Sequence, residues 1–561
     1  MKKHIILMAV GCMAGMTTYG QSAIDAYRFS QPDLKGTARF MSMGGAFGAL
    51  GGDLSTLSQN PAGIGVYRSN EVGFTLDLDF QKSTSDAQGM KTGVDQTKFL
   101  LNNIGGVATL RLPSATVPNL NFGFTYNKGA SFNRRYRGNI PRLDMSMSNY
   151  IAGMANNAGL TVADVESSDY FNPYNPNDGG IAAPWLTILG YDGFLINPNG
   201  DPNDPYWTGQ WGTAGTIDGT AVPATSGSGY FDVIEKGSVD EYNIAIGGNI
   251  ANKVFWGMNF DIINFDYRLQ SLYGENLNNA WVYDTSSDNL QQTSSNWNMQ
   301  NLYRANGSGF NYQLGVIVKP IQELRIGLAV HTPTWYNLTE TYSADLVGSY
   351  YGSNYNPMTN NGTPGYNDVN FRTPWKIIAS AAGVIGSKFI ISADYEWQAY
   401  QYMKFSEPSY NDGYYYDYYS MAGSPFNPDI YADTNLDIKN YYQQTNTLRL
   451  GAEYRITPKF SVRAGYCFVS SPVKPVAKEN KTTIFTAGTM PNYRFDNDTN
   501  YITCGLGYKT SGFYVDLAYV YKHMDSEYHA FSPDPDSSIV SPQASLSLNN
   551  SQLVLSCGIK F

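Results

Sequence analysis

In several segments of the sequence, apolar and polar residues alternate, and charged residues recur among the polar ones. These charged side chains are the residues best placed to hold a charged small molecule. Arg325, Arg449 and Arg463 lie on the polar side of their segments. A guanidinium group there can bind the carboxylate of an amphipathic ligand. Acids on the same faces, such as Asp394 and Glu396, can instead tie the arginines into a structural network. Both interpretations stay open, and the three arginines are candidates for binding a ligand head group.

Two short segments carry metal-ligand residue types, and both have an ordinary structural explanation. HMDSEYH offers His523, Asp525 and His529, while NPNGDPND at 197–204 offers oxygen donors in a pattern that also builds consecutive turns. A solvated loop and a pair of turns are the favoured interpretations. Neither G-x-S-x-G nor H-E-x-x-H is present. We therefore expect no enzyme activity, no metal site and no cofactor.

The composition favours many strands joined by polar loops. Of 561 residues, 14% are aromatic and only 15% are charged, and the formal net charge is −10. Abundant tyrosine and glycine between apolar stretches are typical of β proteins. An acidic chain is not expected to bind nucleic acid.

Residues 1–20, MKKHIILMAVGCMAGMTTYG, have the three parts of a secretory signal peptide: a basic start, an apolar run and small residues before Gln21. The apolar run is too short for a membrane-spanning helix. Lipid attachment at Cys12 is the less favoured alternative. The remaining cysteines, Cys467, Cys504 and Cys557, are odd in number and lack paired spacing, so they predict no disulfide framework.

Strict alternation dominates the rest of the chain. In EVGFTLDLDFQ, Val72, Phe74 and Leu76 share one side and polar residues take the other, which is the period of a β-strand. Many such segments come in pairs joined by a short polar turn, as at 319–323, and these pairs are predicted hairpins. Long segments rich in Asn, Asp, Gly and Ser separate the hairpins.

Fourteen strands are predicted, an even number, with short turns at one end and long loops at the other. These features indicate an all-β fold, a 14-stranded antiparallel transmembrane β-barrel over 71–561, with a soluble sandwich as the alternative. The terminal Phe561 resembles the signal read by the barrel-assembly machinery. The predicted strands are 71–81, 105–113, 119–132, 239–248, 253–269, 308–318, 324–336, 373–384, 387–401, 445–456, 459–470, 499–509, 512–523 and 549–561.

The segment 41–65, MSMGGAFGALGGDLSTLSQNPAGIG, precedes the first strand. Its glycines lack the spacing of a phosphate-binding loop. Small residues permit close packing inside a lumen, Asp53 can cap a short helix that runs to Gln59, and Pro61 discourages its continuation. We expect residues 21–70 to form a hatch inside the barrel.

The order ARFMSMGGAFGALGGDLSTLSQNPAGIG before a first strand resembles the hatch of the FadL/TodX family of outer-membrane transporters for hydrophobic compounds. The family's Asn-Pro-Ala triplet corresponds to Asn60, Pro61 and Ala62, followed by Gly63. The resemblance extends through the paired strands to the end of the chain. It implies an integral outer-membrane protein that passively transports hydrophobic molecules, long-chain fatty acids foremost, with capture by loops, gating at the hatch and lateral exit. Outer-membrane lipid is the expected surrounding partner.

The segment 134–239 is longer than this resemblance leads us to expect. It contains two apolar clusters, with Ile151 and Met154 in one and Trp185, Leu186 and Leu189 in the other. They are candidate substrate-binding residues, although a local core roofing the loops is the alternative. A tyrosine-rich loop at 410–419 suits a ligand, a partner or the membrane interface.

Two other functions stay open besides transport. Aromatic extracellular loops also fit a surface adhesin or haem-binding receptor, and a barrel can host an enzyme with a lipid substrate. Neither requires a plug, whereas a channel that must not leak does. We therefore rank transport first.

Overall fold

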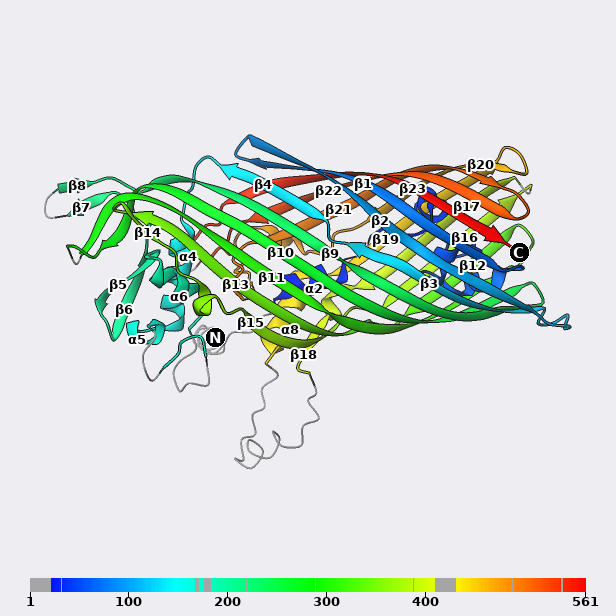
Figure 1. The fold of residues 1–561 in the computed structure, drawn as a ribbon, viewed down its shortest axis with the longest axis horizontal. Coiled ribbons are helices and arrows are strands. Elements are labelled where there is room, and N and C mark those ends of the chain that lie inside the picture. The colour runs from blue at the N-terminus through cyan, green and yellow to red at the C-terminus, as the bar shows by residue number, and fades with distance from the viewer. Residues whose placement is uncertain are drawn as a thin grey trace, which may run out of the picture.

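A computed structural model describes residues 22–31, 33–166, 171–175, 183–217, 220–287, 289–386, 388–408, 430–486, 488–535 and 538–561. The predicted signal peptide and the tyrosine-rich loop at 410–419 lie outside these residues. The chain forms a closed antiparallel barrel, long in one direction, in which the first strand pairs with the last (Figure 1). Fourteen strands build its wall, as predicted.

Most wall strands are continuous, and four are interrupted by a bulge or a short turn and so consist of two segments. The continuous strands are β1 (Glu71–Ala87), β2 (Met90–Arg111), β9 (Ser226–Ile250), β10 (Val254–Asp284), β11 (Asn289–Val318), β19 (Gln444–Arg455), β20 (Phe460–Val469), β21 (Tyr493–Lys509), β22 (Phe513–His529) and β23 (Gln543–Lys560). The split strands are β3 (Asn119–Ser131) with β4 (Arg134–Ile140), β12 (Leu324–His331) with β13 (Trp335–Tyr350), β15 (Gly365–Arg372) with β16 (Lys376–Ile385), and β17 (Phe389–Ala399) with β18 (Lys404–Ser406).

Several strands are much longer than predicted. β10 and β11 contain 31 and 30 residues, whereas a tilted strand crosses a bilayer with about 9–11. The predicted bounds 253–269 and 308–318 stopped before the strands end. Beyond these bounds the alternation continues with apolar residues facing inward, for example Tyr273 on β10 and Trp297 on β11. The same correction applies to 134–239, because β4 and the first half of β9 extend the wall there.

An outward apolar band surrounds the end of the barrel that carries the short turns. Its exposed side chains alternate with buried ones, as a lipid-facing wall requires. The band includes Val72, Phe74, Leu110, Phe122, Ile244, Met258, Ile262, Leu314, Leu328, Ile391, Leu450, Ile502, Leu517 and Leu555. Cys504 and Cys557 lie on this outer face and Cys467 is buried inside. Towards the other end, outward residues are mainly polar, with exposed apolar exceptions such as Leu302 and Val347.

Helices and short hairpins cap that other end. They are α4 (Met147–Ala158), α5 (Val162–Val165), α6 (Trp185–Asp192), the hairpins β5 (Ile196–Asp201) with β6 (Asp204–Gly209) and β7 (Gly215–Ile217) with β8 (Thr220–Val222), β14 (Ser353–Tyr355) and η3 (Thr359–Gly362). The segment 197–204 lies in the β5–β6 hairpin, which agrees with the favoured interpretation as turns. No helix among the described residues has the length and hydropathy needed to span a bilayer.

One side of the upper wall is closed by helices. β18 pairs with β15, and no described strand pairs with its other edge. Here lie η4 (Tyr400–Tyr402), α8 (Ala432–Tyr441) and α9 (Pro475–Lys478). Tyr442, just after α8, forms a β-bridge with Val473, which fixes α8 to the segment that follows β20.

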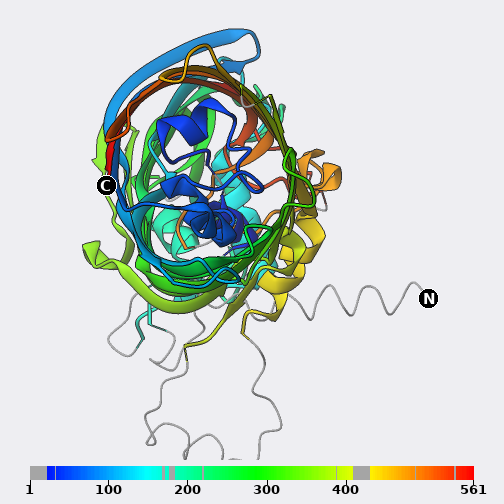
Figure 2. The same cartoon turned by 90° about the vertical axis from the view of Figure 1, so that its right-hand side faces the viewer.

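The amino-terminal residues fill the lumen. They form α2 (Ala23–Ser30), α3 (Ala38–Ser42), η1 (Leu54–Ser58) and η2 (Pro61–Val66), and nearly all of them are buried. Looking along the barrel, these blue elements occupy the interior of the ring (Figure 2). The small hatch predicted inside the barrel is therefore present, and we use "hatch" for residues 33–70.

Candidate functional site

The Asn-Pro-Ala triplet joins the two halves of the hatch. Asn60 caps η2, its side-chain oxygen accepting from the Ala62 amide at 3.1 Å, while its Nδ2 donates to the Gly48 carbonyl at 2.6 Å. Pro61 stands at the first helical position, where its missing N–H is not needed. The Gly63 carbonyl accepts from Gly52 at 3.1 Å. The triplet thus pins 44–52 against 60–65.

Glycines on the inner wall let the hatch backbone lie directly against the strands. A Cβ at Gly315 would overlap the Asn60 side chain, and one at Gly257 would overlap the Pro61 carbonyl. Other inward glycines meet the hatch in the same way, and together they form what we call the inner glycine belt. The belt consists of Gly123, Gly247, Gly257, Gly315, Gly327, Gly451, Gly465 and Gly505.

Polar wall residues then fix the hatch in place. Asp394 accepts from the Gly48 amide and from the Gln59 side chain, each at 2.9 Å. His331 Nε2 lies 2.8 Å from the Gln59 carbonyl. From the hatch side, Lys35 donates to Asp77 at 2.7 Å. These buried contacts favour a single docked position of the hatch.

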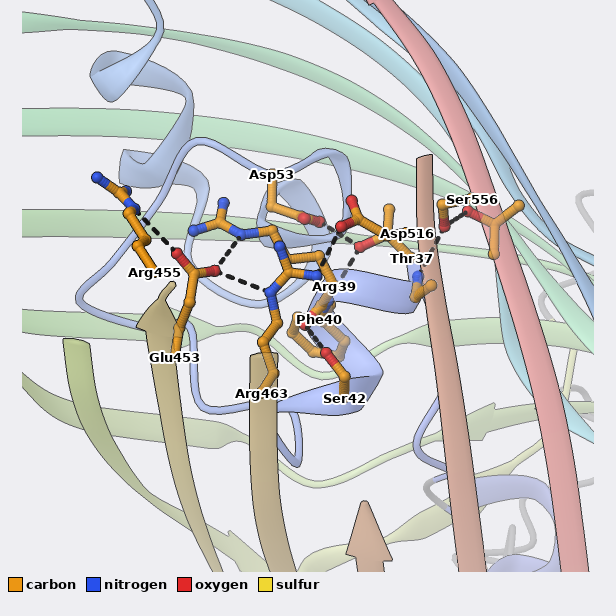
Figure 3. Close-up of polar contacts among 12 residues, drawn as sticks. Thr37, Arg39, Phe40, Ser42, Asp53, Glu453, Arg455, Arg463, Asp516 and Ser556 are labelled. Carbon is orange, nitrogen blue, oxygen red and sulfur yellow. Dashed lines mark hydrogen bonds and ion pairs between the residues drawn. The ribbon is translucent and has the colours of Figure 1, made fainter. Parts of the chain in front are cut away.

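An ion-pair cluster holds α3 at the turn end of the lumen (Figure 3). Arg39 Nε lies 3.1 Å from Glu453, which also receives Arg463 at 2.8 Å. Arg463 in turn contacts Asp516 at 2.6 Å. Nearby, Thr37 donates to Asp53, which caps η1 as predicted.

Each predicted head-group arginine already has a protein partner. Arg463 belongs to the cluster with Glu453, and Arg325 donates to the Leu50 carbonyl at 2.6 Å. Arg449 lies 3.0 Å from Glu396. All three hold the hatch or the wall around it, and only Arg449 also lines the cavity described next. Their role in ligand binding stays a prediction.

A cavity of about 190 Å³ lies in the lumen between α2 and the hatch. It is bounded by the end of α2, by the hatch, and by wall strands from β3 around to β19. Its lining residues are Phe29, Ser30, Gln31, Asp33, Leu34, Lys35, Phe40, Ser58, Gln59, Asn127, Lys128, Gly129, Ala130, Val239, Glu241, Ile263, Asn311, Gln313, His331, Thr332, Thr334, Tyr336, Thr373, Pro374, Lys376, Ile378, Glu396, Gln398 and Arg449.

Lys376 is one of three lysines in this lining, with Lys35 and Lys128, that were not predicted as candidates from the sequence. Lys35, Lys128 and Arg449 each form an ion pair, whereas Lys376 forms none within the described residues. It lies at the start of β16, directly after the turn at Thr373 to Trp375 that splits the strand. The sequence motif that could have indicated Lys376 is TPWK, because a proline that interrupts a strand places the side chains that follow it at a bend in the wall.

Above the cavity, α2 closes the lumen. Phe29 packs edge-on against Phe265 and Phe371, with ring centroids 5.1 and 5.7 Å apart. Tyr27 stacks on Tyr442 at 5.7 Å. These aromatic contacts join α2 to the same apolar core as the cap. The predicted hatch over 21–70 includes α2, which lies at a different level of the barrel from residues 33–70 (Figure 1).

Beside the cavity, the hydrogen-bonded wall is interrupted. β2 pairs with β3 only from Asn103↔Asn127 towards the turn end, and β3 carries a bulge between Lys128 and Ala130. Beyond this point β4 pairs with β9, and no described strand pairs with its other edge. Lys128 to Ala130, at the interruption, line the cavity.

The apolar loop residues predicted to bind substrate are buried in the cap. Ile151 and Met154 lie on α4, and Trp185, Leu186 and Leu189 lie on α6. Four are at most 7% exposed and Met154 packs partly buried against them. None of the five lines the cavity. The local-core interpretation accounts for these contacts, and ligand capture here stays a prediction.

HMDSEYH does not form the predicted surface loop but lies in β22. His523 is 3.5 Å from Asp525, while His529 is buried and stacks on Tyr493. The difference arises because the strand continues beyond the outward apolar band. Within the described part of the chain, no group of His, Cys, Asp and Glu is arranged to hold a metal ion.

Comparison with known proteins identifies the family. The family described as outer membrane protein transport protein (OMPP1/FadL/TodX) matches residues 236–556. No curated protein matches the sequence. Similar solved structures include a Pseudomonas aeruginosa FadL homologue, with 12% identity, a TM-score of 0.49 and coverage of 95% of this chain and 100% of that one.

Another is the P. putida toluene transporter TodX, with 13% identity, a TM-score of 0.48 and coverage of 94% and 99%. The family match spans more than half of the chain, including the wall from β9 to β23. The chain therefore belongs to the OMPP1/FadL/TodX family of outer-membrane β-barrel proteins that transport hydrophobic compounds.

Proposed function

We propose that this protein transports amphipathic hydrophobic molecules with an anionic head, long-chain fatty acids being the foremost candidates. The observation that carries the proposal is Lys376, a cation at the edge of the lumen cavity without an ion-pair partner among the described residues. A carboxylate placed beside it gains a charge-assisted hydrogen bond. An uncharged aromatic hydrocarbon has no comparable contact to make.

The rest of the lining supports an amphiphile. Phe29, Phe40 and Ile263 offer apolar surface, while His331 and Gln398 offer polar groups. Glu241 lines the same cavity and would repel a carboxylate placed close to it. Glu241 and Glu396 both interact electrostatically with Lys376, so the head group must contact Lys376 directly to outweigh their repulsion, and the apolar chain extends away from that contact.

The proposed route has three steps. A ligand captured by the cap passes α2, enters the cavity, and leaves laterally where β2 separates from β3. Passive movement suffices, because an apolar chain gains about 0.8 kcal/mol per methylene on leaving water. A shift of the hatch adjusts the cavity floor and so gates passage. The interrupted wall at Lys128 to Ala130 and the cavity beside it support the lateral step.

The test is uptake by cells that lack their own fatty-acid transporter. We compare uptake of two labelled ligands by wild type, by Lys376→Gln and by the control Lys253→Gln. Lys253 is an exposed lysine in a short turn. We expect Lys376→Gln to lower uptake of a long-chain fatty acid about tenfold, corresponding to one charge-assisted contact. Uptake of the matching long-chain alcohol should change little.

Two results would count against the proposal. Equal loss of acid and alcohol uptake in Lys376→Gln would mean that the lysine shapes the barrel rather than binding the head group. No uptake by wild type, with the barrel present in the outer membrane, would exclude fatty acids as cargo.

A further inference from the structure

Three cations stand side by side on the outer surface of the barrel. Lys236 of β9, Arg268 of β10 and Arg304 of β11 are outward residues, and the strand register places Lys236 and Arg304 directly opposite Arg268. Like charges at directly opposed positions of a sheet destabilise each other. Their alignment therefore needs a compensating anion.

Among the described residues, a single carboxylate pairs with the cations at this position. Asp266 Oδ1 lies 3.0 Å from Arg304, and its Oδ2 lies 3.2 Å from Arg268. Lys236 forms no ion pair within the described residues. The arginine side chains stay 57% and 46% exposed. Three cations thus face one acid.

Other outward acids nearby are already engaged. Asp240, two outward positions below Lys236 on β9, is paired with Lys128. Asp232, two positions above, receives both Nε and Nη2 of Arg135. Asp368 of β15 accepts from the hydroxyls of Thr339 and Tyr366. None is positioned to neutralise the row.

The row borders a surface groove of about 400 Å³. Its walls come from β9, β10, β11 and β13, and apolar side chains of Ile234 and Leu302 stand next to the cations. A groove with guanidinium groups on one side and apolar surface on the other suits a phosphorylated sugar, which has both anionic oxygens and flat C–H faces.

The distance of the three cations from the apolar band indicates which kind of lipid headgroup can reach them. Arg268 lies six residues beyond Ile262, the last large apolar residue of β10 that is exposed on the outer face. With about 3.3 Å per residue and a tilt near 40°, this places it roughly 15 Å outside the hydrocarbon. Phospholipid headgroups extend only about 5–8 Å. A phosphate group carried on the larger sugar headgroup of a glycolipid extends far enough from the hydrocarbon to reach the three cations.

We propose that Lys236, Arg268 and Arg304 bind phosphate on the sugar headgroup of an outer-leaflet glycolipid. The two arginines offer planar, multiple donors, which suit phosphate oxygens, and the lysine adds a mobile charge. The contact anchors the protruding part of the barrel to the layer around it. This site is separate from the lumen and does not rest on the proposed function.

The experiment measures binding of a purified bacterial glycolipid with phosphorylated core sugars to the detergent-solubilised protein. We compare wild type with the triple variant K236Q/R268Q/R304Q. The control K91Q/R142Q/K459Q removes the same charge from exposed residues elsewhere. The triple variant should bind at least tenfold more weakly, and the control should match wild type. All these side chains are exposed, so heat-resistant migration of the folded barrel should be unchanged.

Wild type alone provides a second test that does not depend on folding of the variants. Chemical dephosphorylation of the glycolipid should weaken binding at least tenfold, and rising salt should weaken only binding of the phosphorylated form. Inorganic phosphate should compete poorly. Equal binding of both glycolipid forms, full competition by inorganic phosphate, or unchanged binding by the triple variant would overturn the proposal.

Discussion

At the scale of single residues, Asn60 makes contacts that no neighbouring side chain can replace. Its amide caps η2 and reaches Gly48, and both bonds are buried. Replacing it with alanine leaves the Gly48 carbonyl and the Ala62 amide without these partners, at a cost of about 1–3 kcal/mol for each buried group left unpaired. The barrel ladder does not depend on either bond.

We therefore expect the double variant Asn60→Ala with Pro61→Ala to loosen the hatch without unfolding the barrel. Hydrogen exchange of amides at 44–65 should speed up roughly ten- to a hundredfold, and ligand flux should change. Ser58→Ala, which removes a partly buried hydroxyl bond within the hatch, is the matched control. Loss of heat-resistant migration in the double variant would show instead that the barrel needs the triplet.

The sequence revealed the triplet and the Asp53 cap because both are local patterns. It predicted that Arg325, Arg449 and Arg463 can join a structural network but not which partner each has, since Leu50, Glu396 and Glu453 are brought to them by closure of the barrel. Lys376 escaped notice for the same reason. Only the assembled lumen distinguishes a cation facing a cavity from one facing an acid.

At the scale of elements, the inner glycine belt determines how closely hatch and wall approach. Gly315→Ala should place a methyl group against Asn60 and destabilise the docked hatch by about 1–3 kcal/mol. Alanine normally stabilises a strand relative to glycine. Destabilisation by Gly315→Ala would therefore indicate a clash between the added methyl group and the hatch. The control is Gly93→Ala on β2, where no atom lies within 4 Å of the added Cβ. Protease sensitivity of the hatch should rise only in the first variant.

The helix α8 carries a pH-sensitive group. Burial, together with the neighbouring Asp433, raises the pKa of Asp437 from 3.8 to about 7, although a hydrogen bond from Tyr441 acts in the opposite direction. The folded helix thus holds a proton that the unfolded one releases. Stability from this group is full below about pH 4 and is lost as the pH rises through about 7.

We accordingly expect protease cleavage near α8 to increase between pH 5 and pH 8. Asp437→Asn should remove this dependence, because the amide does not titrate, while Asp433→Asn should lower the midpoint only slightly. An unchanged pH profile in Asp437→Asn would refute the assignment. Heat-resistant migration at each pH monitors the barrel itself.

Strand number could be predicted from the sequence, whereas strand length could not. Alternation of outward apolar residues marks each crossing of the hydrocarbon; its exposed large side chains end at Ile262 on β10 and, apart from Leu302, at Phe310 on β11. Above that level, the stable pairing depends on aromatic residues that meet inside the lumen, such as Phe265 with Tyr336. Those contacts join strands far apart in the chain, so no local window contains them.

At the scale of the whole molecule, two closures stand in series along the lumen. α2 joins the wall and the cap above the cavity, and the hatch docks on the glycine belt below it. Passage through barriers in series is limited by the higher one. Opening either closure alone should therefore produce little ion leakage through the full length of the barrel.

This arrangement predicts a non-additive response. Phe29→Ala removes a large buried aromatic side chain, worth about 3–5 kcal/mol, and should release α2, while Asn60→Ala loosens the hatch. Each single variant should keep conductance in a planar bilayer close to that of wild type. The double variant should show conductance well above the sum of the two singles.

The two closures also differ in what they control. Phe29→Ala alone should raise access of a small thiol reagent from the outside to a cysteine introduced at Ser30, which lines the cavity, whereas Asn60→Ala alone should not. Strictly additive conductance in the double variant would mean that one closure already carries the whole barrier. The thiol measurement would then identify which one, because only the closure above the cavity protects residue 30 from the outside.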